Sequence, residues 1–275
     1  LNRSGIRTSV RTSAAGGRLN TGDCWLANGA NLEITATPSN HWHFGAWSGD
    51  TAGCAIASNR ISVLMDRPRA ITAGFAMDQH SLPVNTPRGI GSPPAGIHWY
   101  NYGAVTSAAL ASSPVVEGKT QYVCKGWTGT GGVPASGTKT NTPAFTLTNN
   151  SSITWLWRTN CWLDVTVVGC GRLSTGNCWI GFGTNVQVVA TPSNHWHFAE
   201  WFGDTYGCTI ASNKITVPMN QPRIVLARFA LDQHSLVVKS AHGISVPPAG
   251  TNLFDYQSTQ SVAVACSPVE NDRTQ

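Results

Sequence analysis

Apolar and polar residues alternate with a period of two along several short stretches of the chain. Side chains two residues apart lie on one face of a strand, so each stretch predicts a strand with a buried face. Gly, Pro, Asn and Asp interrupt the alternation about every 8–12 residues, and no stretch has a capped apolar stripe of helical period. Segment 107–112 is also interpreted as a strand. The chain is therefore predicted to be all-β. The clearest alternating stretches are Leu32/Ile34/Ala36, Ile61/Val63/Met65, Ile71/Ala73/Phe75, Leu163/Val165/Val167 and Val225/Ala227/Phe229.

The chain repeats itself with an offset of 154 residues. Thr37–Phe44 recurs unchanged as Thr191–Phe198, and an ungapped alignment of 17–82 with 171–236 gives 41 identities in 66 positions. A fainter similarity divides each period into two modules, A and B, of roughly 77 residues. Both ends of the sequence fall within modules, so we expect a window on a longer array. The predicted modules, small antiparallel β units in tandem, are A1 (1–77), B1 (78–157), A2 (158–231) and B2 (232–275).

Two kinds of segment in the A modules resemble a known repeat family. The first is Phe44-Gly-Ala-Trp-Ser-Gly-Asp50 with its copy Phe198–Asp204, and the second is Ile71-Thr-Ala-Gly-Phe75 with its copy Val225–Phe229. These motifs resemble the divergent InlB B-repeat family, although Lys125–Thr130 in B1 lacks the Asp. The resemblance implies compact β-rich modules, sometimes β-grasp-like, in large bacterial surface or secreted proteins. It also implies spacers, adhesive segments or assembly units without catalytic residues.

Large aromatic residues at the ends of the repeated motifs are predicted to form the module cores. The resemblance places a core residue at each Trp of the Trp-x-Gly segments, and the alternating strands end in further aromatic residues. The predicted structural core residues are Trp47, Phe75, Trp127, Trp157, Trp201 and Phe229.

Four of the eight cysteines occupy matched positions in A1 and A2. We predict that Cys24 pairs with Cys54, and Cys178 with Cys208, which places the chain in an oxidising, extracellular compartment. A zinc site is disfavoured because the sequence contains no Cys-x2-Cys pair. The remaining cysteines stay unassigned, with Cys124 to Cys161 among the open pairings. Cys161 and Cys170 are expected to have no cysteine counterpart in A1, where Arg7 and Gly16 stand. The unassigned set is Cys124, Cys161, Cys170 and Cys266.

The composition argues against most kinds of chemistry. Charged residues make up 11%, and the 13 acidic residues contain no paired-carboxylate motif. No Gly-x-Ser-x-Gly elbow or phosphate-binding loop occurs, so neither enzymatic activity nor a cofactor is predicted. The net charge of +5 is spread without a basic cluster, which disfavours a nucleic-acid partner. No apolar run reaches the about 18 residues of a membrane helix, so no membrane span is predicted, and any signal peptide is absent or already removed.

Repeated histidines give the most distinctive polar signal. If His41-Trp-His43 and His195-Trp-His197 lie in strands, both imidazoles of each pair share a face. They are then either metal ligands or part of a surface ladder, that is, a row of aromatic and imidazole side chains beside a buried Trp. A metal needs a third ligand, for which only His80 and its copy are repeated candidates. We favour the ladder and take these four residues as candidate interface residues, with no metal.

Two further kinds of residue are candidates for ligand binding, the repeated aspartates and the tryptophans near turns. Asp50 and Asp204 offer too few oxygens for calcium, and we expect these carboxylates to accept backbone N–H groups in turns. Tryptophans near Gly-rich turns are candidate platforms for stacking sugars, although no polar constellation surrounds them. These tryptophans are Trp25, Trp99, Trp162 and Trp179.

The sequence supports two functions of different classes. The favoured one is a non-catalytic, extracellular structural array that forms a filament, stalk or sheath. Its partners are adjacent modules and other copies of the chain. The alternative is a cell-surface adhesin that binds glycan or host protein.

Overall fold

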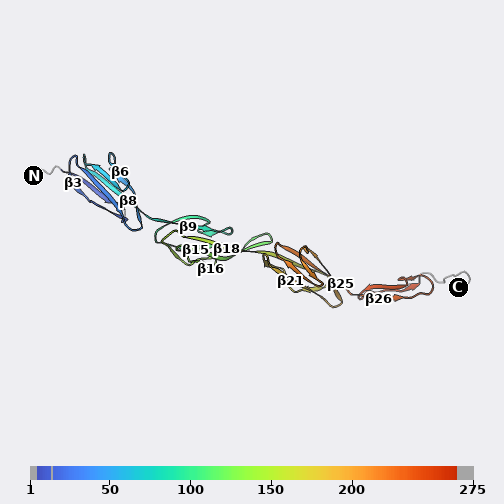
Figure 1. Ribbon diagram of the computed structural model, residues 1–275. Helices are drawn as coiled ribbons and strands as arrows, with labels where there is room; N and C mark the ends of the chain where they lie inside the picture. The colour runs from blue at the N-terminus through green and yellow to red at the C-terminus, as the bar shows by residue number, and fades with distance from the viewer. Residues whose placement is uncertain (1–4, 14, 265–275) are drawn as a thin grey trace. The chain divides into compact units, whose positions relative to one another are not determined.

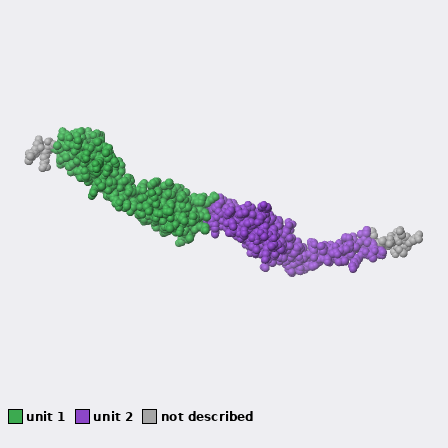
Figure 2. Space-filling model, viewed as in Figure 1, with its two compact units in different colours: residues 1–113, 124–157 green, residues 114–123, 158–275 purple. Residues whose placement is uncertain are grey.

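The computed structural model describes residues 5–13 and 15–264, and within these ranges it contains strands, turns and loops but no helix (Figure 1). The all-β prediction is therefore confirmed. No membrane-spanning helix is found in these residues. The chain divides into two compact units, residues 1–113 with 124–157 and residues 114–123 with 158–275 (Figure 2).

In the first unit, the A1 segment forms two four-stranded sheets with a core between them. Val10 and Ile71 from one sheet contact Ile34, Ile61 and Val63 from the other, and all five are buried. This is the packing that alternating apolar residues predict. The first sheet has the order β3 (Cys24–Ala27), β1 (Gly5–Thr12), β8 (Arg69–Met77), β5 (Trp42–Gly49). The second has the order β2 (Gly17–Leu19), β4 (Asn31–Pro38), β7 (Arg60–Leu64), β6 (Ala55–Ala57).

The rest of the first unit is built around a separate core in the B1 segment. Leu82, Leu147, Ile153 and Trp155 are fully or almost fully buried there. The expected strand in 107–112 is present as Ala109–Leu110. The strands are β9 (Gln79–Asn85), β10 (Gly91–Ser92), β11 (Gly96–Asn101), β12 (Ala104–Thr106), β13 (Ala109–Leu110), most of β15 (Thr120–Thr130), β16 (Ser136–Gly137), β17 (Phe145–Leu147) and the start of β18 (Ser152–Val168).

The second unit repeats the A1 architecture in the A2 segment. Leu163, Val188, Ile215 and Val225 lie in its buried core. Its strands are the end of β18, β19 (Gly171–Leu173), β20 (Cys178–Gly181), β21 (Asn185–Pro192), β22 (Trp196–Gly203), β23 (Thr209–Ala211), β24 (Lys214–Pro218) and β25 (Arg223–Leu231). The unit also contains β14 (Val115–Glu117), β26 (Gln233–Val238), β27 (Ser245–Val246), β28 (Gly250–Asp255) and β29 (Ala263–Val264).

The strand register corrects one expected counterpart. Cys161 lies opposite Ile180 as Ile6 lies opposite Leu26, so Cys161 corresponds to Ile6 and not to Arg7. The reason is a difference in length just after this strand. Thr12 and Val167 pair with matched alanines of β8 and β25, yet three residues lie between Thr12 and Gly16 and only two between Val167 and Cys170.

Most strand pairs are antiparallel, as predicted, but three are parallel. β1 runs parallel to β8, β18 to β25, and β18 to β9. Parallel neighbours need a long crossover connection, and here the intervening strands of the module provide it. In a module whose first and last strands run parallel, the chain enters at one end and leaves at the opposite end. This path allows modules to follow one another in series.

The predicted core aromatics differ in burial. Phe75, Trp127, Trp201 and Phe229 are buried. Trp47 and Trp157 are partly buried against the A1 and B1 cores.

Candidate functional site

The A1 and B1 segments meet at Asp78, between β8 and β9. The Asp78 backbone N–H donates to the carbonyl of His41 at 2.9 Å, and the Asp78 carbonyl accepts from the N–H of Tyr102 at 2.8 Å. One residue therefore connects the β4–β5 turn of A1 to the end of the β9–β11 hairpin of B1. We call this contact the joint, and its side chains are those of Asn40, His41, His43, Asp78, His80 and Tyr102.

Aromatic stacking reinforces the joint. The His41 ring lies on the Tyr102 ring with centroids 3.4 Å apart and planes within 6°. The His80 ring lies 6.0 Å from the same Tyr102 ring. Asn40 Nδ2 lies 2.9 Å from His41 Nε2, which fixes the orientation of the imidazole. Stacked aromatic pairs contribute about 0.5–1.5 kcal/mol beyond the area that they bury.

An exposed hydrogen bond between a histidine and a carboxylate lies beside the stack. His43 Nδ1 is 3.0 Å from Asp78 Oδ1, and both side chains are substantially exposed. Exposed pairs contribute about 0–1 kcal/mol, because water and salt screen them. The stack and the two backbone hydrogen bonds therefore account for most of the contact.

The second unit has a second joint with the same contacts. His195 stacks on Tyr256 at 3.8 Å and 7°, and His197 Nδ1 lies 3.1 Å from Asp232 Oδ1. The backbone hydrogen bonds recur between Asp232, His195 and Tyr256 at 2.9 and 2.8 Å. Sequence reasoning missed both tyrosines, although they stand 154 residues apart and so carried the repeat signal.

The structure corrects the expected orientation of each histidine pair. His41 and His195 have φ of 65° and precede the strands that begin at Trp42 and Trp196. Because they do not lie in the strands, they do not share a strand face with His43 and His197. In residues 5–13 and 15–264, no three His, Cys, Asp or Glu side chains are grouped to hold a metal ion.

A buried arginine organises the opposite end of A1. Arg69 is 5% exposed, and its guanidinium donates to the carbonyls of Asp50 and Ala52 at 3.1 and 2.8 Å. It also donates to Asp66 Oδ1 at 2.9 Å, and this hydrogen bond lowers the pKa of Asp66. In A2, Arg223 makes the matching bonds, except that its third acceptor is the amide of Asn220.

The predicted cysteine pair of A1 lies at this arginine. Cys24 is directly opposite Thr8, and Thr8 is directly opposite Arg69, so the three side chains share one face of the sheet. Cys54 Sγ lies 3.8 Å from Arg69 Nη1. Both thiols are free in the structure, and the pairing of Cys24 with Cys54 stays a prediction.

The other cysteines occupy varied environments. Cys178 and Cys208 are partly buried free thiols, and burial raises the pKa of Cys208 although Arg223 opposes the effect. Burial also raises the pKa of Cys161, whereas Cys170 is exposed. Cys124 is partly buried, and Cys266 lies outside the described residues.

The Asp carboxylates of the repeated Gly-Asp motif accept backbone N–H groups, but across strands instead of within their own turns. Asp50 Oδ2 accepts from Ala70 N–H, and Asp204 Oδ2 from Ile224 N–H, both at 2.8 Å. Each carboxylate thus ties the end of β5 or β22 to the neighbouring strand.

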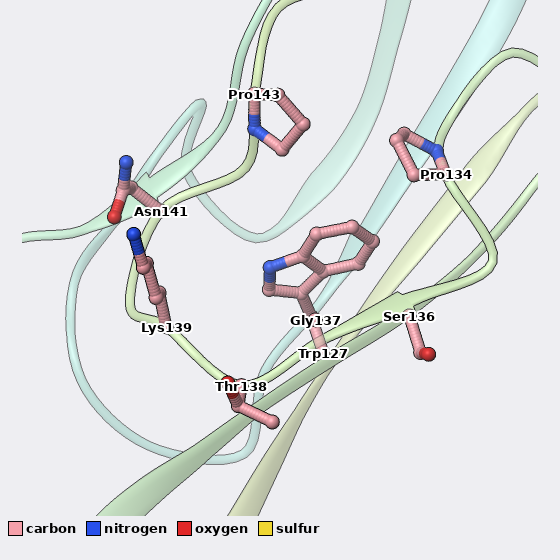
Figure 3. A pocket seen from close by; sticks show the side chains of 8 residues that line it. All are labelled: Trp127, Pro134, Ser136, Gly137, Thr138, Lys139, Asn141 and Pro143. Carbon is pink, nitrogen blue, oxygen red and sulfur yellow. The ribbon is translucent and has the colours of Figure 1, made fainter.

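The tryptophans proposed as sugar platforms are dispersed. Trp25 and Trp99 are 69% and 62% exposed, while Trp162 and Trp179 pack edge to face with centroids 5.1 Å apart. None of these four lines the pocket of B1 that lies over Trp127 (Figure 3). This pocket of about 520 Å³ is lined by Trp127, Pro134, Ser136, Gly137, Thr138, Lys139, Asn141 and Pro143.

Comparison with protein-family models identifies the repeated segments. The family model of the divergent InlB B-repeat domain matches residues 8–79 and 163–233, which are the A1 and A2 segments. No curated protein and no solved structure matches the chain significantly.

Proposed function

The chain belongs to the divergent InlB B-repeat family, and from this premise we propose that it is a non-catalytic segment of an extracellular array. Its modules pack in series and form a stalk, sheath or filament. The observation that carries this proposal is the joint, whose ring stack, His–Asp contact and backbone hydrogen bonds recur in both units with nearly equal distances. A contact repeated at this precision is expected where the spacing of successive modules matters.

Two further properties favour an extracellular array. A disulfide between Cys24 and Cys54, and between Cys178 and Cys208, would brace modules whose cores are small, in the oxidising compartment where such proteins reside. The low charged fraction of 11% leaves little repulsion between neighbouring copies. We therefore propose that the partners are adjacent modules and other copies of the chain.

Electron microscopy of the native material tests this function. We expect ordered fibres or sheaths in which each contact between copies buries more than about 1,000 Å² with an apolar centre. Isolated chains with free ends, or contacts that are small and wet, would contradict assembly. They would favour the alternative function, an adhesin that binds glycan or host protein.

A further inference from the structure

The loop that follows β15 in B1 differs from its equivalent in A1. In A1, the indole N–H of Trp47 donates to the carbonyl of Ser58 at 3.0 Å, in the turn between β6 and β7. In B1, Trp127 is 2% exposed and its indole nitrogen has no hydrogen-bond partner. The indole nitrogens of Trp155 and Trp201 are also unpartnered, but neither residue lines the pocket over Trp127.

Hydrogen bonds hold the loop that forms this pocket. Ala108 N–H donates to Thr142 Oγ1 at 2.9 Å, and Thr142 N–H donates to the carbonyl of Ala108 at 2.8 Å. Leu110 N–H donates to the carbonyl of Thr140 at 2.8 Å. Gly137 packs so closely on the indole that an added Cβ would lie 2.6 Å from the Trp127 ring. The walls are therefore formed before any ligand arrives, as in most binding pockets.

None of the residues that line the pocket is acidic. The Lys139 ammonium only donates hydrogen bonds, the Asn141 amide both donates and accepts, and the Trp127 indole nitrogen itself is buried beside Gly137. Figure 3 shows the nitrogen side of the indole turned towards Lys139 and Asn141, with Pro134 on the opposite side. One side of the pocket therefore suits an anionic acceptor, and the other suits an apolar ring face.

We propose that this pocket binds an acidic sugar, namely a pyranose ring that carries a carboxylate. The carboxylate lies towards Lys139 and Asn141, where charge-assisted hydrogen bonds are strongest. The C–H face of the ring contacts the prolines, and the hydroxyls of Ser136 and Thr138 match the ring hydroxyls because each both donates and accepts. The volume of about 520 Å³ lies within the range of about 300–1,000 Å³ for small-molecule sites. This site is additional to the packing function and does not depend on it.

Nuclear magnetic resonance of the full chain labelled with 15N at tryptophan tests the site. The probe is tetragalacturonic acid, and maltotetraose is the neutral comparison of equal length. We expect tetragalacturonic acid to shift one indole N–H resonance, which Trp127→Phe removes, and maltotetraose to leave it unshifted. Because the carboxylate contact is ionic, added salt is expected to weaken binding.

Charge variants separate this site from general attraction to a basic protein. Lys139→Gln is expected to weaken tetragalacturonic acid binding about tenfold, the loss of one charge-assisted hydrogen bond. Lys214→Gln, an exposed lysine in the other unit, is expected to leave binding unchanged. Equal weakening by the two variants, equal binding of maltotetraose, or equal binding of a glutamate tetrapeptide at the same indole would overturn the proposal.

Discussion

Tryptophans of the repeated motif and of the surface differ sharply in burial, and this difference predicts their effects on stability. Trp201 is 7% exposed in the A2 core, so Trp201→Ala leaves a large cavity. We expect it to lower the free energy of unfolding of A2 by about 3–5 kcal/mol, as measured by urea titration. Trp25→Ala is the control, since that side chain is 69% exposed. A stable Trp201→Ala chain would show that Trp201 is not a packing residue.

Two glycines of A2 form a second matched pair at the residue scale. A Cβ added at Gly171 would lie 2.4 Å from the Phe229 ring, while one added at Gly176 meets no atom within 4 Å. Since Phe229 is buried in the core and cannot move away freely, Gly171→Ala is expected to destabilise A2 by about 1–3 kcal/mol. Gly176→Ala should change the unfolding midpoint little. Equal midpoints for the two variants would contradict the close packing.

Acid titration of Asp66 distinguishes A1 from A2. The Arg69 guanidinium lowers the pKa of Asp66 below its ordinary value of 3.8. A lowered pKa contributes stability that is present above 3.8 and is lost as pH falls through the folded-state pKa. A2 has Asn220 on Arg223 and lacks this titration. Amide hydrogen exchange measured at pH 5 and at pH 3 tests this difference. Over this range, the protection of A1 amides should fall more in the unsubstituted chain than in an Asp66→Asn variant. Equal falls in the two chains would contradict the pairing of Asp66 with Arg69.

At the scale of elements, the cysteines test whether the sheet ends are cross-linked. The register places Cys24 beside Thr8 and Arg69, and Cys54 against the same guanidinium. Closing this loop of about 30 residues stabilises a module by about 3–4 kcal/mol in the chain-entropy model. We expect non-reducing peptide mapping of the native protein to recover Cys24 linked to Cys54, and Cys178 linked to Cys208. Free thiols at these four positions would reject both the pairing and the extracellular location.

The elements that the sequence predicts best are those with one buried face. Ile71, Ala73 and Phe75 alternate because they point into the core, so periodicity alone identifies β8. The His-Trp-His spacing predicts that His41 and His43 share a face of one strand, and the left-handed backbone of His41 leaves no periodic signal in the sequence. His41 and Tyr102 lie far apart in the sequence, and their stacking becomes evident only in the folded structure, where two turns bring the rings together. The pocket over Trp127 was missed because its loop has no second copy to compare.

At the scale of the whole molecule, the function of an array depends on how firmly each module holds the next. In the first unit, the joint connects A1 to B1 through two backbone hydrogen bonds of Asp78 and the stack of His41 on Tyr102. The backbone bonds survive substitution of side chains, whereas the stack does not. Tyr102→Ala therefore isolates the contribution of the stack.

We expect Tyr102→Ala to leave both modules folded but to let A1 and B1 tumble more independently. In 15N relaxation of the full chain, the rotational correlation times of A1 and B1 amides should separate and shorten relative to the unsubstituted protein. Tyr206→Ala is the control, because Tyr206 is 92% exposed on the A2 surface. If Tyr102→Ala and Tyr206→Ala give the same correlation times, the ring stack does not stiffen the joint. The spacing of modules would then depend on the strand connections and the backbone hydrogen bonds alone.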